Sequence, residues 1–144
     1  MTINPYVPTT AVGNGTQVDF TFTFPYISPA HVTATINGVA TTAFTFFSSN
    51  ILRFNTPPAD GTTVRILRET PGDELAAVFQ PGGPLPIFGL NNNFLQSLFY
   101  NQETQYDAAN QSTAGLQAQI DGIIVTSNTA QATADAALAL ANAT

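Results

Sequence analysis

Basic side chains are almost absent from this sequence. Its 144 residues contain three arginines (Arg53, Arg65 and Arg68), no lysine and one histidine, against nine acidic residues, which gives a formal net charge of −6. Three cations cannot neutralise enough phosphates to give useful affinity for nucleic acid. We therefore expect no nucleic-acid partner.

Cysteine is also absent, which excludes disulfides and thiolate metal sites. No apolar run reaches the roughly 18 residues of a membrane span, and the longest clusters, such as Ile123–Val125, are far shorter. The first residues lack the basic and apolar regions of a signal peptide. We expect no membrane span, metal or cofactor.

Charged residues of either sign make up only 8% of the chain, against about 25% in a typical soluble domain. Apolar residues make up 44%, which is enough for a real core. The surface must then consist largely of neutral Thr, Asn, Gln, Ser and Ala. Such a surface suits packing against other protein copies, because little charge has to be desolvated.

The chain before Pro86 is patterned as short strands. In "VDFTFTFPYI", apolar residues alternate with Asp and Thr, so Phe20, Phe22 and Phe24 share one face and are predicted to line a core. Residues 31–47 read as a hairpin around Asn37-Gly38, and 51–55 and 63–69 read as further strands. The fold class is therefore mainly β: a small antiparallel β-sandwich or barrel, followed by a linker and a long C-terminal helical, coiled-coil segment.

Composition suggests three segments: a β-domain at 1–79, a Pro/Gly-rich linker at 80–89 and a helix at 90–144. Asn91 to Asn93 offer N-caps for the helix. A heptad frame runs through it without a stutter, which favours self-association, although Gly115 and Gly122 each weaken the helix by about 1 kcal/mol. The number of associating helices stays open. The frame's core positions are Leu95, Phe99, Gln102, Tyr106, Ala109, Thr113, Leu116, Ile120, Ile123, Ser127, Ala130, Ala134, Ala137 and Ala141.

No pattern points to catalysis. His31 stands alone at a predicted strand start without a nucleophile or carboxylate motif around it. Asp73 and Glu74 are neighbours in a loop, where carboxylates are usually just solvated. We expect a protein that is not an enzyme.

Arg65 and Arg68 are three residues apart in a strand, so their side chains point to opposite faces. Arg68 shares its face with Val64 and Ile66 and should be partly buried, whereas Arg65 should be mainly solvated. A buried guanidinium needs a partner, because an unpaired buried charge is strongly unfavourable. The candidates are Glu69, Asp73, Glu103 and Asp107, and a bond to Glu103 or Asp107 would fix the β-domain against the helix.

Four stretches in fixed order resemble a known family: "NGTQVDFTFTFPYI", "ATINGV", "PPADGTTVRILRETP" and "GLNNNFLQSLFYNQETQYDA". Together, over about residues 5 to 110, they resemble the N-terminal virion-anchoring domain of T7-like, short-tailed phage tail fibre proteins. The matching positions are Gly15, Phe20, Phe24, Tyr26, Pro58, Gly61, Val64, Ile66, Arg68, Thr70, Leu90, Asn91, Gln96, Gln102, Glu103 and Asp107.

The resemblance implies a structural protein of the virion tail. It would form a homotrimer, dock on the tail adaptor and nozzle proteins, and carry a distal fibre or tip protein that meets the host. The chain is then either a short adaptor fibre or part of a longer one. The residues expected at its interfaces are Arg68, Glu103, Asp107, Leu95, Phe99, Tyr106, Leu116, Ile120 and Ile123.

Two alternatives accompany this reading. One is a carbohydrate-binding β-sandwich module with an oligomerisation tail, with Tyr26 near Asp19 as its sugar site. The other is a fibre-borne depolymerase, which would need paired catalytic carboxylates in a groove. The segment from Leu90 to Asp107 favours the anchor reading, because it fits the fibre family and has no role in a sugar site.

Overall fold

A computed structural model describes residues 6–143 of the chain. The predicted outer limits at residues 1 and 144 therefore lie outside the described residues. The chain divides into two compact units, Met1–Tyr106 and Asp107–Thr144. The first unit contains all the described strands and the beginning of the long helix.

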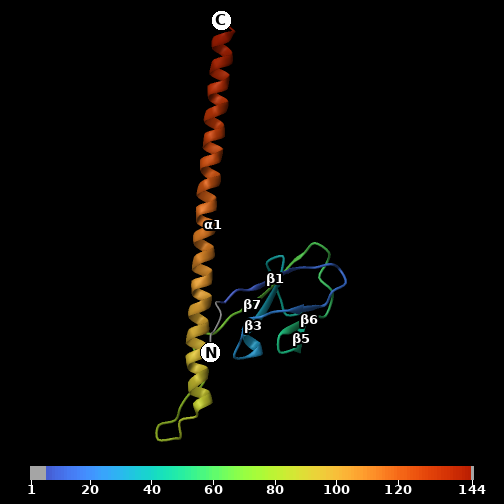
Figure 1. Ribbon diagram of the computed structural model, residues 1–144, viewed down its shortest axis with the longest axis vertical. Coiled ribbons are helices and arrows are strands. Elements are labelled where there is room, and N and C mark those ends of the chain that lie inside the picture. The colour runs from blue at the N-terminus through green and yellow to red at the C-terminus, as the bar shows by residue number, and fades with distance from the viewer. Residues whose placement is uncertain (1–5, 144) are drawn as a thin grey trace. The chain divides into compact units, whose positions relative to one another are not determined.

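The strands of the first unit form two antiparallel sheets (Figure 1). The four-stranded sheet has the order β1-β7-β3-β4 and the three-stranded sheet has the order β2-β6-β5. A short 3-10 helix, Pro29–His31, precedes β3. The strands are β1 Thr9–Val12, β2 Asp19–Thr21, β3 Val32–Ile36, β4 Val39–Thr41, β5 Phe44–Ser48, β6 Ile51–Phe54 and β7 Thr63–Arg68.

The predicted Asn-Gly turn is confirmed. Asn37 and Gly38 both have positive φ, 50° and 80°, and join β3 to β4 as a tight hairpin. Asn37 tolerates this conformation better than most residues, and its side-chain oxygen also accepts a hydrogen bond of 2.8 Å from the Thr63 amide. The turn therefore ties the hairpin to the start of β7.

Two strand predictions differ from the structure. The predicted hairpin at 31–47 contains a third strand, β5, which leaves β4 and pairs with β6 in the other sheet. The strand β1 was not predicted, because "TTAV" is a short and weakly alternating run. It lies at a sheet edge, where β7 supplies its hydrogen-bonding partner.

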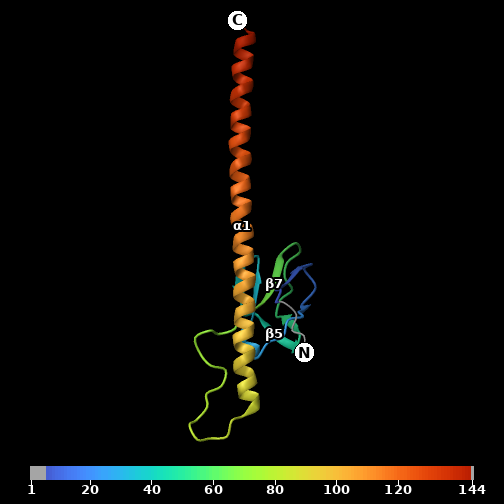
Figure 2. The same ribbon diagram turned by 60° about the vertical axis from the view of Figure 1, so that its left-hand side comes forward.

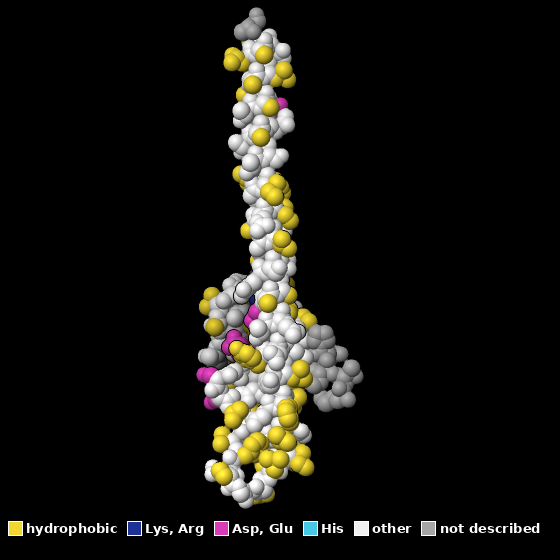
Figure 3. Space-filling model, turned by 90° about the vertical axis from the view of Figure 1, so that its left-hand side faces the viewer, with side chains coloured by type: hydrophobic (Ala, Val, Ile, Leu, Met, Phe, Trp, Pro, Cys, Tyr) yellow, Lys and Arg dark blue, Asp and Glu magenta, His cyan; other side chains and the backbone are white. Residues whose placement is uncertain are grey.

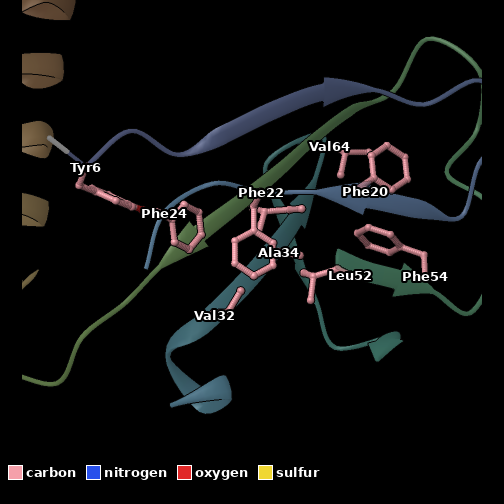
Figure 4. Close-up of a cluster of buried hydrophobic side chains, with 10 residues drawn as sticks. Tyr6, Phe20, Phe22, Phe24, Val32, Ala34, Leu52, Phe54 and Val64 are labelled. Atoms are coloured by element: carbon pink, nitrogen blue, oxygen red, sulfur yellow. The ribbon is translucent and has the colours of Figure 1, made fainter. Parts of the chain in front are cut away.

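The predicted phenylalanine core is confirmed. Phe20, Phe22 and Phe24 are buried, and Phe22 has no exposed surface. Their side chains meet residues of both sheets in one cluster (Figure 4). The buried members of the cluster are Tyr6, Phe20, Phe22, Phe24, Val32, Ala34, Leu52, Phe54, Val64 and Ile66.

Helix α1, Ile87–Asn142, begins three residues before the predicted start at Leu90. The Leu90 amide already donates to the Pro86 carbonyl at 3.1 Å, so Pro86 stands at the helix start, where its missing N–H costs nothing. Asn91 to Asn93 consequently lie inside the helix and are not N-caps. The predicted linker at 80–89 loses its last three residues to the helix.

The second unit, from Asp107, is the remainder of α1, and its described side chains are exposed. Several threonines bond to the carbonyl four residues earlier, as Thr113 does to Ala109 at 3.0 Å. Within residues 6–143, no helix is long and apolar enough to cross a membrane.

Candidate functional site

Arg68 is the centre of the candidate site. It is the last residue of β7, and its side chain shares the inner face with the buried Val64 and Ile66, as predicted. The Arg68 side chain has no exposed surface. Arg65, on the other face of the same strand, is half-buried.

The guanidinium of Arg68 donates to partners in helix α1 and in the loop after β2, which are distant in sequence. Its Nε donates to Glu103 Oε1 at 2.6 Å, and Glu103 is one of the four carboxylates that the sequence offered as partners. One terminal nitrogen donates to the Pro25 carbonyl at 2.7 Å, and the other to Gln102 Oε1 at 3.0 Å. The planar guanidinium can donate to all of these partners at once, whereas the compact ammonium of a lysine could not reach them with the same geometry.

The Glu103 carboxylate also has partners besides Arg68. Its Oε1 also accepts a hydrogen bond from the Thr70 hydroxyl at 2.7 Å, and its Oε2 accepts one from the Thr70 amide at 2.8 Å. The carboxylate therefore joins α1 both to Arg68 and to the backbone immediately after β7. The Arg68 guanidinium makes four hydrogen bonds and the Glu103 carboxylate accepts three, which compensates for the desolvation of the two charges.

Two aromatic rings lie against the guanidinium. The centre of the Arg68 guanidinium lies 3.9 Å from the Phe99 ring centroid and 4.6 Å from that of Tyr6. The Tyr6 hydroxyl accepts from the Arg68 amide at 2.8 Å, and its ring meets Tyr106 edge-on. We call Tyr6, Arg68, Thr70, Phe99, Gln102 and Glu103 the junction cluster.

The junction cluster contains a buried and hydrogen-bonded ion pair that joins strand β7 to helix α1. The polar atoms of Arg68 and Glu103 bond to protein groups, and water is largely excluded from them. Among residues 6–143, no group of three or more His, Asp or Glu side chains is placed to hold a metal ion. The hydrogen bonds between Arg68, Thr70 and Glu103 are suited to fixing the first-unit part of α1 on the sheet.

A second contact, which the sequence did not suggest, fastens the chain between β7 and α1. Gln96 accepts from the Ala76 amide at 2.7 Å and donates to the carbonyls of Pro71 and Glu74 at 2.8 and 2.6 Å. Asn93 accepts from the Ala77 amide and donates to its carbonyl. The only available signal was the excess of amide side chains in this part of the helix, and it does not specify partners.

The other predicted interface residues fall into two groups. Phe99 is buried and Tyr106 packs against the core, so both contact the β-domain of their own chain, and Leu95 is half-buried. Asp107, Leu116, Ile120 and Ile123 are exposed in the second unit. The heptad positions in the first unit thus already pack, at Phe99 and Tyr106, against the β-domain of the same chain.

Tyr26 and Asp19, the predicted sugar site, are engaged elsewhere. The Tyr26 hydroxyl donates to the Ser49 carbonyl at 2.7 Å, and its ring packs with Phe22 and Phe46. Asp19 forms a bidentate ion pair with Arg53, in which both hydrogen bonds are 2.7 Å long. The hydrogen bond from Arg53 lowers the pKa of Asp19, and the same bond raises the pKa of Arg53.

Comparison with known proteins identifies a family for the part of the chain that contains Arg68 and Glu103. Residues 1–126 match the family described as "Phage T7 tail fibre protein, N-terminal domain". The chain belongs to this family. The match covers the β-domain, the junction cluster and the start of the second unit, and it confirms the resemblance found in the sequence.

Two curated phage proteins are similar to the chain. A protein named "Anchor protein" from Klebsiella phage KP34 is 32% identical over 89 residues, which are 62% of this chain and 29% of that protein. An "Anchor protein" from Klebsiella phage NTUH-K2044-K1-1 is 30% identical over 89 residues, 62% of this chain and 28% of that protein. The matched segment therefore spans less than a third of either relative. Family and relatives together point to the virion tail as the location of this chain and to a structural role.

Proposed function

We propose that this chain is a structural tail fibre or fibre adaptor protein. Its β-domain attaches to the adaptor and nozzle proteins of the phage tail, and its helix self-associates as a homotrimer that carries the distal host-attachment apparatus. The observation that supports this most directly is the family match over residues 1–126. The relatives named as anchor proteins support the same role.

The junction cluster gives this proposal a physical mechanism. A fibre that is attached at one end must keep its direction under load, so the joint between its anchor and its helix has to resist rotation. Arg68 and Glu103 supply hydrogen bonds in several directions, whereas apolar packing alone is non-directional. In this proposal the β-domain is a small sandwich, and the shared cluster of both sheets supports that.

Self-association follows from the second unit. Its exposed Leu116, Ile120 and Ile123 lie at heptad positions, and an isolated helix gains most of its stability from packing its apolar face. Pairing with other copies would bury these residues. The trimeric state comes from the family resemblance, since the small heptad side chains do not select a number of helices.

The test uses virus particles that lack this protein. Purified chain should bind to these particles, and a reconstruction of the reassembled particles should place the β-domain on the tail and the helix pointing away from it. Arg68→Met should reduce incorporation, whereas Arg65→Met should reduce it less. Binding of the chain to the host surface but not to the particles would overturn the proposal.

A further inference from the structure

An unusual apolar surface surrounds the start of α1 in the first unit. Large hydrophobic side chains gather there on the helix and on the loop that precedes it (Figure 3). Phe88 is 86% exposed and Val78 is 75% exposed. Clusters of this kind on soluble proteins usually mark sites of contact with another molecule. We call this surface the apolar collar, and its members are Leu75, Val78, Ile87, Phe88, Phe94 and Leu98.

The collar is held in place by specific contacts. Figure 2 shows the loop running beside the first turns of α1. The amide side chains of Gln96 and Asn93 bond to the loop backbone between Pro71 and Ala77, as described above. At Gly89 an added Cβ would come within 3.0 Å of Ala77, so glycine is what allows the loop to approach the helix this closely. The loop backbone is thus satisfied against the helix, while the side chains of Leu75 and Val78 remain exposed.

Three of the four helical members of the collar lie on the side of α1 away from the β-domain. Ile87, Phe94 and Leu98 are separated by seven and four residues, which places them on one face of a helix. Gln96, Phe99 and Glu103, the buried residues of α1, occupy the opposite face. The first unit therefore offers a second seam with coiled-coil spacing, and the β-domain does not cover it.

Charge is entirely missing from this region. From Leu75 through Gln102 the sequence contains no Asp, Glu, Lys, Arg or His. Recognition of a different protein commonly uses complementary charges for orientation. Residues that lie close to a rotation axis meet their own equivalents in the other copies, so a charge placed there would face its own kind. A charge-free apolar seam with heptad spacing is therefore best suited to contact with further copies of the same chain.

We propose that the apolar collar is a contact surface between copies of this chain, with Phe94 and Leu98 at its centre. This inference rests on the self-association in the proposed function, and it assigns the contact in the first unit to a different face from the Leu95, Phe99 and Tyr106 frame predicted from sequence. It adds a contact beside the anchor domain to the one expected in the second unit.

The test is cysteine cross-linking in the full chain, which has no cysteine of its own. Phe94→Cys and Leu98→Cys are made separately, and Thr104→Cys, exposed on another face of the same helix, is the matched control. A disulfide forms only when the two Cα atoms come within about 7 Å. Under mild oxidation, the two collar variants should form covalent dimers between copies and the control should remain monomeric on a denaturing gel.

A charge variant gives an independent measurement. Phe94→Glu places like charges together at the seam and should weaken self-association by about tenfold or more, as measured by sedimentation, whereas Thr104→Glu should not. Unchanged circular dichroism would show that the variants fold.

Each other outcome has a defined meaning. Self-association without cross-linking at positions 94 and 98 would overturn the collar contact and leave the proposed function intact. Equal cross-linking of the Thr104→Cys control would also overturn it, because random collision would explain the result. A monomeric wild-type chain would overturn both the collar contact and the homotrimer, while binding to particles would still test attachment to the tail.

Discussion

At the scale of single residues, Arg68 shows why a chain with so few cations would keep one in its interior. Its guanidinium is enclosed by Phe99 and Tyr6 and bonded to Glu103. A buried ion pair is not necessarily more stabilising than apolar residues of equal volume. We propose that its contribution here is orientation, because its hydrogen bonds to Gln102 and Glu103 are directional and join the first-unit part of α1 to β7.

Replacement of Arg68 by methionine tests this directly. The change leaves the Glu103 carboxylate buried without its cation, and we expect the first unit to lose about 3–5 kcal/mol of unfolding free energy in denaturant titration. Arg65→Met, on the half-buried face of the same strand, should cost less than about 1 kcal/mol.

A double variant separates orientation from stability. In Arg68→Met with Glu103→Leu no unpaired charge remains, so much of the lost stability should return. Incorporation into particles should nevertheless stay low. Recovery of both stability and incorporation would mean that the pair has no orienting role.

Phe22 tests the core. Its side chain is fully buried and touches Phe24 and Phe46, with ring centroids 4.8 and 6.4 Å away. Phe22→Ala should lower the unfolding free energy by about 3–5 kcal/mol, because both the buried surface and the packing around it are lost. A loss below about 1 kcal/mol would contradict the observed burial. Phe47→Ala, at an exposed position, is the matched control.

The Asp19–Arg53 pair predicts a pH dependence. Because Arg53 lowers the pKa of Asp19 in the folded state, the pair's contribution is present above the unfolded pKa of that carboxyl and is lost as the pH falls through the folded pKa. Asp19→Asn should therefore flatten the acid side of a plot of melting temperature against pH. Asp60→Asn, in an exposed turn, is the matched control.

At the scale of elements, the loop between β7 and α1 is ordered by side chains of the helix rather than by its own sequence. Gln96 supplies three of its hydrogen bonds. Gln96→Ala should leave the carbonyls of Pro71 and Glu74 without this donor, so the loop should open more often.

Hydrogen exchange provides the measurement for the loop. In Gln96→Ala the amide of Ala76 should exchange about tenfold faster or more, which corresponds to the loss of roughly one hydrogen bond's net stability. Exposed Gln105, changed to alanine, should leave that rate unaltered. Unchanged exchange in the Gln96 variant would mean that apolar contacts, such as Phe79 with Gly89, hold the loop by themselves.

At the scale of the whole molecule, the proposed self-association of the helix can be tested by mass. The second unit exposes Leu116, Ile120 and Ile123, and we expect light scattering on the full chain at micromolar concentration to give an oligomeric mass. Ile120→Asp should shift that mass towards the monomer, because it puts a charge into the seam. Gln117→Asp, off the seam, should not. A monomeric mass for the unaltered chain would contradict the prediction.

The sequence determined the features that depend on local pattern. Alternation identified Phe20, Phe22 and Phe24 as core residues, and the preference of Asn37 and Gly38 for positive φ fixed one hairpin turn. The face shared by Arg68, Val64 and Ile66 followed from the two-residue period of a strand. The scarcity of carboxylates then limited the possible partners of Arg68 to four, of which Glu103 is the observed one.

Tertiary structure decided the features that depend on partners distant in the chain. The edge position of β1 and the transfer of β5 to the second sheet come from pairing with β7 and β6, which no local pattern in "TTAV" or "FTFFS" encodes. The heptad frame predicted that Phe99 and Tyr106 are buried by self-association, whereas the structure packs them against the β-domain of the same chain. Phe94 and Leu98 remain exposed because they lie on the opposite face of α1 from the one that packs against the β-domain.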